Sequence, residues 1–198
     1  MKVNNLNELL VHELKDLYDA EHQLVAALPK LAEAANNAKL AEAFRNHLEQ
    51  TEEHVTRLAA VFRECGEEPD RETCKAMKGL IDEADRIRKL DTDDPDVLDA
   101  ALISAAQRVE HYEIAAYGTL KVWAATAGLD GAVQLLSETL LEEKAADEKL
   151  TEIAESGVNR EAEGREDAEP VTTTVRHRSS NASRARKPAR SPRPTKAR

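Results

Sequence analysis

The sequence contains few aromatic residues and no long hydrophobic run. Only 3% of its 198 residues are aromatic, although 41% are hydrophobic, and the chain is rich in Ala, Leu, Glu and Lys. β-Strands are enriched in aromatic and β-branched residues, whereas Ala, Leu, Glu and Lys are strong helix formers. The composition therefore argues against an all-β protein and favours an all-α fold. The length suits one domain, or one domain with a tail.

The sequence also lacks a membrane-spanning segment, a secretion signal and a cysteine-rich motif, which limits the expected cellular location of the protein. No stretch approaches the roughly 20 apolar residues of a bilayer-spanning helix, and the N-terminus lacks the basic-then-apolar pattern of a secretion signal. Cys65 and Cys74 are the only cysteines in the sequence, too few for a zinc site made of four cysteines. We therefore expect a cytoplasmic protein with no membrane partner, whose two thiols are reduced.

Charge is divided unevenly along the chain. The net charge is -10, but residues 171–198 hold nine Lys or Arg and no Asp or Glu. Residues 1–170 hold the other 19 of the 28 basic residues and all 38 acidic residues, which gives this part a net charge of -19. The sequence thus predicts an acidic body with a basic arm.

Apolar residues recur at alternating three- and four-residue steps in five segments, which is the pattern of helices with one apolar face. These segments are residues 10–31, 41–62, 77–87, 98–123 and 133–154. Asn4 or Asn5 is the expected cap of the first helix, and Asp70 that of the third. Four helices are long, and the short third one lies where a four-helix bundle with one long crossover needs its connection. We predict an all-α four-helix bundle over residues 1–157, with an additional short helix in the crossover.

The apolar pattern disappears from residue 158 onward. Residues 158–170 are expected to form an acidic linker. In residues 171–198, Lys and Arg are separated by Pro, Ser and Ala without an apolar face, so this segment is predicted to be a disordered basic tail. Such a tail can neutralise phosphates and bind DNA without sequence preference. The alternatives are a tail that contacts the acidic body and a solvated extension.

Carboxylates interrupt the apolar faces of three predicted helices. Glu21 and Glu113 each lie seven residues from an apolar residue on both sides. Glu143 and Asp147 lie on the apolar face of the last predicted helix. Glu110 lies one turn before Glu113 and faces nearly the same way. A buried carboxylate is unfavourable unless it is protonated, paired with a cation or bound to a metal. Because few Lys or Arg occupy these faces, the pattern predicts a metal site.

The predicted donor set is rich in oxygen and poor in imidazole. In di-iron carboxylate bundles, two helices each give a Glu and the other two each give Glu-x-x-His. The second helix here has Thr51 in place of the Glu but keeps His54, and the last helix keeps Glu143 but has Ala146 in place of the His. Oxygen ligands with some imidazole suit iron or manganese, and zinc is an alternative. We predict about two Fe ions per chain. The candidate ligands are Glu21, His54, Glu110, Glu113, Glu143 and Asp147.

Each candidate also has a structural interpretation. The equivalent glutamates of the first and fourth helices could accept hydrogen bonds from Tyr18 or Tyr117, and the two carboxylates of the last helix could pair with neighbouring lysines. Glu110 could be a solvated residue. His47 shares a helix face with His54, seven residues away, and is either a further ligand or a hydrogen-bonding residue at the edge of the core.

Four segments carry a distinctive combination of residues. They are residues 10–21, residues 47–54, residues 110–120 with Glu-His-Tyr-Glu, and residues 142–147 with Glu-Glu-Lys-Ala-Ala-Asp. Over about residues 5–157 the chain resembles the YciE/YciF family of ferritin-like bacterial stress proteins. The resemblance implies a ferritin-like fold, a homodimer and a di-metal centre, and it implies little about a reaction.

Two classes of function follow from these features. One is a di-metal oxidoreductase or metal-handling protein, which would oxidise ferrous iron or consume peroxide or oxygen. The other is a non-catalytic, structural or DNA-associated stress protein, whose buried carboxylates are structural and whose basic tail binds DNA. Metal content after purification separates the two classes.

Overall fold

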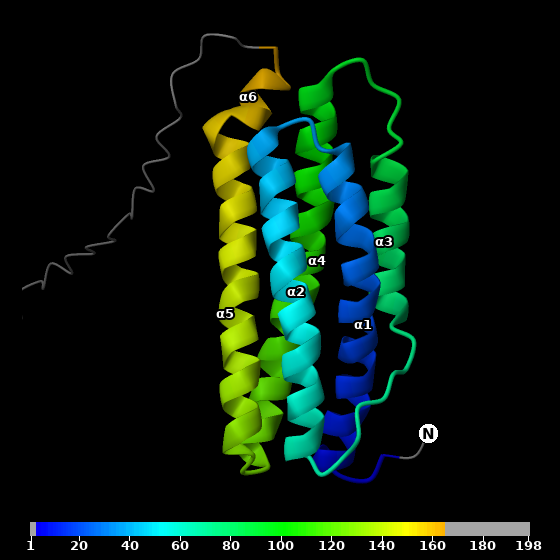
Figure 1. Cartoon of the computed structure of the whole chain (residues 1–198), viewed down its shortest axis with the longest axis vertical. Helices are drawn as coiled ribbons and strands as arrows, with labels where there is room; N and C mark the ends of the chain where they lie inside the picture. Colours follow the sequence, from blue (N-terminus) through cyan, green and yellow to red (C-terminus); the bar gives the residue numbers. More distant parts are fainter. Residues whose placement is uncertain (1–2, 165–198) are drawn as a thin grey trace, which may run out of the picture.

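A computed structural model describes residues 3–164, which form helices and no strands. The four long helices α1 (Leu6–Ala34), α2 (Ala38–Glu64), α4 (Pro95–Thr126) and α5 (Asp130–Ile153) form an elongated bundle (Figure 1). The short helix α3 (Lys75–Ile87) lies in the long connection between α2 and α4, which run in the same direction (Figure 1). The predicted all-α bundle with a short helix in its crossover is confirmed.

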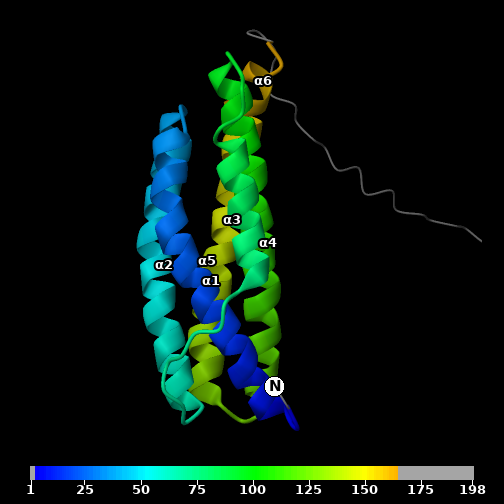
Figure 2. The ribbon, with the colours of Figure 1, turned by 90° about the vertical axis from the view of Figure 1, so that its right-hand side faces the viewer.

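The bundle consists of two helical hairpins. The most extensive contacts are those of α1 with α2 and of α4 with α5, and the contact between α2 and α5 joins the hairpins. Figure 2 shows α1 and α2 on one side and α4 on the other, with α3 lying along α4. Side chains from all four long helices therefore meet in one core.

The apolar faces predicted from the sequence are the buried faces of the helices. The buried side chains include Leu14 and Leu24 of α1, Phe44 and Phe62 of α2, Leu102 and Leu120 of α4, and Leu136 and Leu150 of α5. Each such side chain contributes roughly 1.5–3 kcal/mol relative to an exposed one. None of the helices between residues 3 and 164 combines the length and apolar character of a membrane span.

One helix cap matches the expectation and another does not. The side chain of Asn5 accepts a hydrogen bond from the backbone N–H of Glu8 (2.9 Å) and caps α1. The expectation that Asp70 caps the third helix is wrong, because α3 begins at Lys75 and is capped by Cys74. Asp70 instead pairs with Lys15 (2.7 Å) and so fixes the preceding loop to α1.

The helical course continues beyond the predicted end of the bundle at residue 157. After α5 the chain forms a π-helical turn, η1 (Ala154–Val158), and a short helix, α6 (Asn159–Glu161). Val158 is fully buried, and both η1 and α6 contact α4. The first residues of the predicted linker therefore belong to the packed body. The rest of that linker and the predicted basic tail lie outside the described residues.

Candidate metal centre

A polar layer interrupts the apolar core of the bundle. It contains four carboxylates and two imidazoles, each at most 5% exposed. Its members are Glu21 of α1, His47 and His54 of α2, Glu110 and Glu113 of α4, and Glu143 of α5. The helical register that buries the neighbouring leucines also buries these side chains. Five of the six were predicted as ligands, and His47 was left open between ligation and hydrogen bonding.

The ligand atoms of this layer form two groups that share one residue. The outer group comprises His47, Glu110, Glu113 and Glu143, and the inner group comprises Glu21, His54 and Glu143. Within each group the ligand atoms lie within 4.8 Å of one another. Two groups with a common carboxylate are the arrangement that a pair of neighbouring metal ions needs.

Most carboxylate oxygens of the polar layer have no hydrogen-bond donor among the described residues. Both oxygens of Glu113 are buried without a donor in this part of the chain, as is Oε2 of Glu21, Glu110 and Glu143, whereas Oε1 of Glu143 lies 2.9 Å from Nδ1 of His54. A buried polar atom without a partner costs about 1–3 kcal/mol, and more when it is charged. Two divalent cations would balance the four negative charges and supply the missing contacts, so the residues fit a di-metal group.

His54 lies between three carboxylates. Its Nε2 is 2.8 Å from Oε2 of Glu142, and its Nδ1 is 2.9 Å from Oε1 of Glu143 and 3.6 Å from Oε1 of Glu21. Burial disfavours the charged imidazole, but the neighbouring carboxylates outweigh it and raise the pKa of His54 to about 10. This raised pKa favours the charged imidazole in the metal-free protein, and His54 would have to lose its Nδ1 proton to bind a metal.

Arg57 holds the carboxylate on the outer side of His54. Its guanidinium pairs with both oxygens of Glu142 and also donates to the hydroxyl of Thr139 (3.3 Å). Although burial alone would raise the pKa of Glu142, Arg57 and His54 lower it. A carboxylate bound to one nitrogen of a histidine directs the other nitrogen toward the metal. Sequence reasoning missed this role of Glu142, because the apolar pattern places it only at the edge of the helix face.

Four further groups of the layer have shifted pKa values. Burial raises the pKa of Glu21, Glu110 and Glu113, and the charge of Glu143 raises all three further. Burial lowers the pKa of His47 and keeps its ring neutral, the form that binds metals. Its Nε2 lies 3.4 Å from Oε1 of Glu110, and neither ring nitrogen makes a hydrogen bond within the described part of the chain. The structure therefore places His47 among the candidate ligands.

Asp147, a predicted ligand, belongs to neither group. Its side chain is 22% exposed, accepts a hydrogen bond from Nε2 of Gln107 (3.2 Å) and lies 3.5 Å from Nε2 of His111. Asp147 is separated from the two groups because of its position along the bundle axis. Asp147 lies one turn, about 6 Å, beyond Glu143, and there it meets Gln107 and His111 instead of the carboxylates of α4. Asp147 is thus absent from both groups, and its assignment as a ligand stays a prediction.

Two neighbouring side chains bear on the candidate ligands, one at a position where the di-iron pattern has a glutamate and one beside Glu21. Thr51, at the position of a glutamate, donates its hydroxyl to the backbone oxygen of His47 (2.7 Å) and so turns away from the layer. Tyr117 is fully buried and donates its hydroxyl to Oε1 of Glu21. The alternative of a tyrosine bond to Glu21 is thus real, but it leaves Oε2 of Glu21 without a donor within residues 3–164. The hydrogen bond from Tyr117 and metal ligation by Glu21 are therefore compatible.

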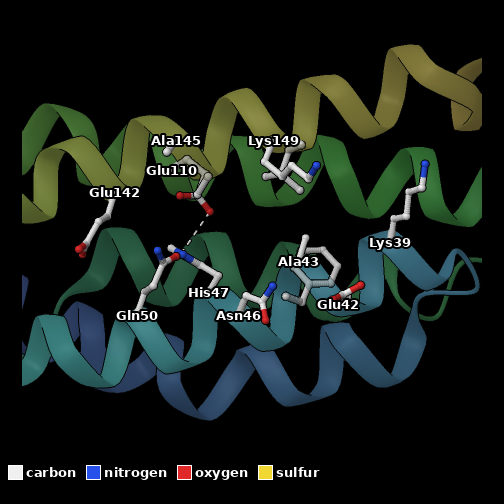
Figure 3. Close-up of a pocket in the computed structure, with 13 residues that line it drawn as sticks. Lys39, Glu42, Ala43, Asn46, His47, Gln50, Glu110, Glu142, Ala145 and Lys149 are labelled. Carbon is white, nitrogen blue, oxygen red and sulfur yellow. Dashed lines mark ion pairs between the residues drawn. The ribbon is translucent and has the colours of Figure 1, made fainter.

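A cavity of about 500 Å³ opens between α2 and α5 beside the outer group (Figure 3). His47 and Glu110 face one another in its interior (Figure 3). Apolar side chains form much of its walls, among them Ala43, Phe44, Ala146 and Leu150. The polar layer is therefore reachable from one side of the bundle.

Comparisons with known proteins agree with this architecture. Residues 5–163 match the family described as a domain of unknown function, DUF892. Protein YciF of Escherichia coli (strain K12) is 47% identical over 166 residues, which cover 83% of this chain and 99% of YciF. The crystal structure of the E. coli stress protein YciF matches with a TM-score of 0.75 and 43% identity, over 81% of this chain and 99% of that one.

A second solved structure is similar. YcfI of Rhodopseudomonas palustris, for which a structural role has been put forward, matches with a TM-score of 0.73 and 45% identity, over 76% of this chain and 95% of that one. The predicted resemblance to YciE/YciF proteins is thus confirmed, and the chain belongs to the DUF892 family as a homologue of E. coli YciF.

Proposed function

We propose that this protein is a di-metal carboxylate protein that binds two iron ions in its core and couples the oxidation of ferrous iron to the reduction of peroxide. The observation that carries the proposal is the set of fully buried carboxylate oxygens without donors in the described residues, above all the two oxygens of Glu113. A fold does not maintain such a set without protons or cations to neutralise it.

The arrangement of the two groups supports a particular assignment. Glu143, common to both groups, would contact both ions, while Glu21 and Glu113 would each contact one ion, on the inner and outer sides. His54 completes the inner group, and His47 with Glu110 completes the outer one. Oxygen donors with two imidazoles suit iron or manganese, and zinc is the alternative.

The chain's own residues prepare this site for a two-electron reaction. A pair of iron ions can supply one electron each, so that two ferrous ions, one hydrogen peroxide and two protons give two ferric ions and two waters. Glu142 orients His54, and Tyr117 holds one oxygen of Glu21 in place. The apolar bundle around the layer restricts water to the side of the cavity.

Metal analysis after anaerobic reconstitution with ferrous iron tests the proposal. The wild-type protein is expected to bind about two ions per chain, and a Glu113→Ala, Glu143→Ala double variant to lose both. Asp147→Ala is the matched control, because Asp147 lies outside both groups, and it should retain full stoichiometry. Full stoichiometry in the double variant would contradict the assignment. Stopped-flow oxidation of ferrous iron by peroxide then tests the chemistry.

A non-catalytic, structural role is the second candidate. It is favoured by the similarity to YcfI, for which such a role has been put forward. In this case protons on the glutamates of raised pKa would replace metal as the neutralising charge. Ferrous oxidation no faster with protein than in buffer would favour this candidate. Participation in a stress response, suggested by the similarity to the E. coli stress protein, is compatible with both. Homodimerisation and a cytoplasmic location remain predictions.

The basic segment 171–198 is proposed to bind DNA non-specifically, although it lies outside the described residues. The proposal rests on its nine positive charges beside a body of charge -19, which DNA repels. Removal of residues 171–198 should abolish mobility shifts of duplex DNA. With four to six phosphate contacts, raising salt from 50 to 200 mM should weaken binding by roughly two to three orders of magnitude. Equal shifts by the full and shortened proteins would place DNA binding in the body.

A further inference from the structure

The cavity between α2 and α5 reaches one ligand group and not the other. Within the described chain its lining includes His47 and Glu110 of the outer group, but neither Glu21 nor His54 of the inner group. Glu143, which is common to both groups, is fully buried and is not among the lining residues. The two proposed metal positions therefore differ in their distance from solvent.

Polar atoms of the outer group face the cavity without partners. His47 and Glu110 are 5% and 3% exposed, and among residues 3–164 both ring nitrogens of His47 and Oε2 of Glu110 have no hydrogen-bond partner. Figure 3 shows both side chains directed into the space between α2 and α5. These atoms are free to contact a species that arrives through the cavity.

The inner group is closed on its sides. Glu21 and His54 are fully buried. Tyr117 covers Glu21 and donates to it, while Glu142, fixed by Arg57, covers the Nε2 side of His54. A metal ion in the inner position could leave only after these contacts open or after it has passed the outer position.

Small residues keep the cavity open. The di-iron pattern would place a histidine at position 146, whereas this chain has Ala146 there, facing the cavity with Ala43 from the opposite helix. The volume of about 500 Å³ lies in the range of small-molecule sites, well above the space that a metal ion or a peroxide needs. Polar groups in the lining, such as Glu42, Asn46 and Gln50, offer oxygen atoms to a passing cation.

We infer that this cavity is the path by which ferrous iron and peroxide reach the core, and that the outer position exchanges its metal with solvent while the inner position retains it. The inference rests on the proposed di-metal function and specifies it. The ion of the inner group is then a resident part of the site, and the ion of the outer group is the one delivered and removed.

Release of ferrous iron to a colorimetric chelator under anaerobic conditions tests the inference on the full chain. The loaded wild-type protein should release its two ions in two phases of equal amplitude. Ala43→Phe combined with Ala146→Phe should slow the fast phase by about tenfold or more, which corresponds to an added barrier of about 1.4 kcal/mol. Ala125→Phe, on the exposed face of α4 and away from this cavity, should leave both phases unchanged.

A ligand variant identifies the phases. His47→Ala removes a ligand of the outer group alone, so it should eliminate the fast phase and keep the slow one. If the double phenylalanine variant binds less metal, the single variant Ala146→Leu must still slow the fast phase at full stoichiometry. Release of both ions at one rate in the wild type, or a fast phase unaffected by these substitutions, would overturn the inference. Absence of bound iron in the wild type would instead refute the proposed function itself.

Discussion

Two kinds of buried carboxylate occur in this molecule, and their surroundings differ. Asp99 of α4 is fully buried and accepts hydrogen bonds from the backbone N–H groups of Asn36 (2.8 Å) and Asn37 (2.7 Å). Asp19 of α1 is 7% exposed and accepts from the backbone N–H of Cys74 (2.9 Å) and from Arg71 (2.8 Å). Both carboxylates join segments that are distant in the sequence.

The glutamates of the polar layer are buried to the same degree, but none accepts a hydrogen bond from a backbone N–H or an arginine within residues 3–164, and Glu113 has no donor there at all. The contrast also shows in their pKa values. Burial would raise the pKa of Asp19, but its donors and Arg71 lower it, whereas burial and neighbouring carboxylates raise the pKa of Glu110 and Glu113. The fold thus supplies donors where a carboxylate has a structural role. The scarcity of donors in the polar layer indicates a different use of its carboxylates.

The largest effect is expected at Asp99, the fully partnered carboxylate. Asp99→Ala would leave two backbone N–H groups of the α1–α2 turn without acceptors, and each costs about 1–3 kcal/mol. Denaturant unfolding should show a loss of roughly 3 kcal/mol. Asp93→Ala, at an exposed position of the loop before α4, is the control and should change stability by less than about 0.5 kcal/mol.

Substitution in the polar layer should have the opposite sign in the metal-free protein. Glu113→Met removes a buried carboxylate without donors in the described chain and fills its volume. With a chelator present, we expect a gain of about 1–2 kcal/mol in the free energy of unfolding, since apolar replacement of buried charge is often stabilising. The same variant should lose iron from the outer group. Destabilisation in chelator would show that Glu113 has a structural partner.

The pH dependence should reverse when metal is bound. The raised pKa values of Glu21, Glu110 and Glu113 stabilise the metal-free fold fully below their unfolded value of 4.5, and this stability is lost as the pH rises. The metal-free protein should therefore unfold at higher denaturant concentration at pH 5 than at pH 7. The iron-loaded protein should show the reverse order, because ligands must be deprotonated. Parallel curves with and without iron would contradict metal ligation by these groups.

A further effect, on metal affinity alone, is expected from the carboxylate that contacts His54. Glu142→Gln weakens the carboxylate contact that orients the ring, and loss of such a partner typically reduces metal affinity by about 10- to 100-fold. Competition with a chelator of known affinity would measure the change. Glu148→Gln, at an exposed position on the same helix, should have no effect. An equal loss in both variants would assign the effect to net charge alone.

Local sequence patterns were sufficient for much of the fold. The spacing of leucines located the four long helices, and the interruption of that spacing by Glu21, Glu113 and Glu143 located most of the polar layer. Helix ends were less predictable. Asp70 has the residue type of a helix cap, but its bond to Lys15 depends on how the crossover lies against α1. The buried Val158 likewise follows from contact of the last turns with α4.

The membership of the site was decided at the level of tertiary structure. Glu143 and Asp147 lie on one face of α5. Their different surroundings depend on which residues of α4 lie opposite along the bundle axis: Glu110 is grouped with Glu143, whereas Gln107 and His111 contact Asp147. His47 is ambiguous in the sequence for the same reason, because its role depends on what the opposite helix presents.

The sequence by itself determined which side chains must be buried, because helical periodicity assigns each residue to a face regardless of its partners. It thereby placed charged groups in an apolar core. Only the tertiary structure decided which of them meet, through the relative heights of four helices whose contacts involve residues far apart in the chain. That alignment gives Asp99 its backbone donors, whereas the glutamates of the polar layer have no backbone donors within the described residues. It also leaves one side of the polar layer open to the cavity beside Ala146.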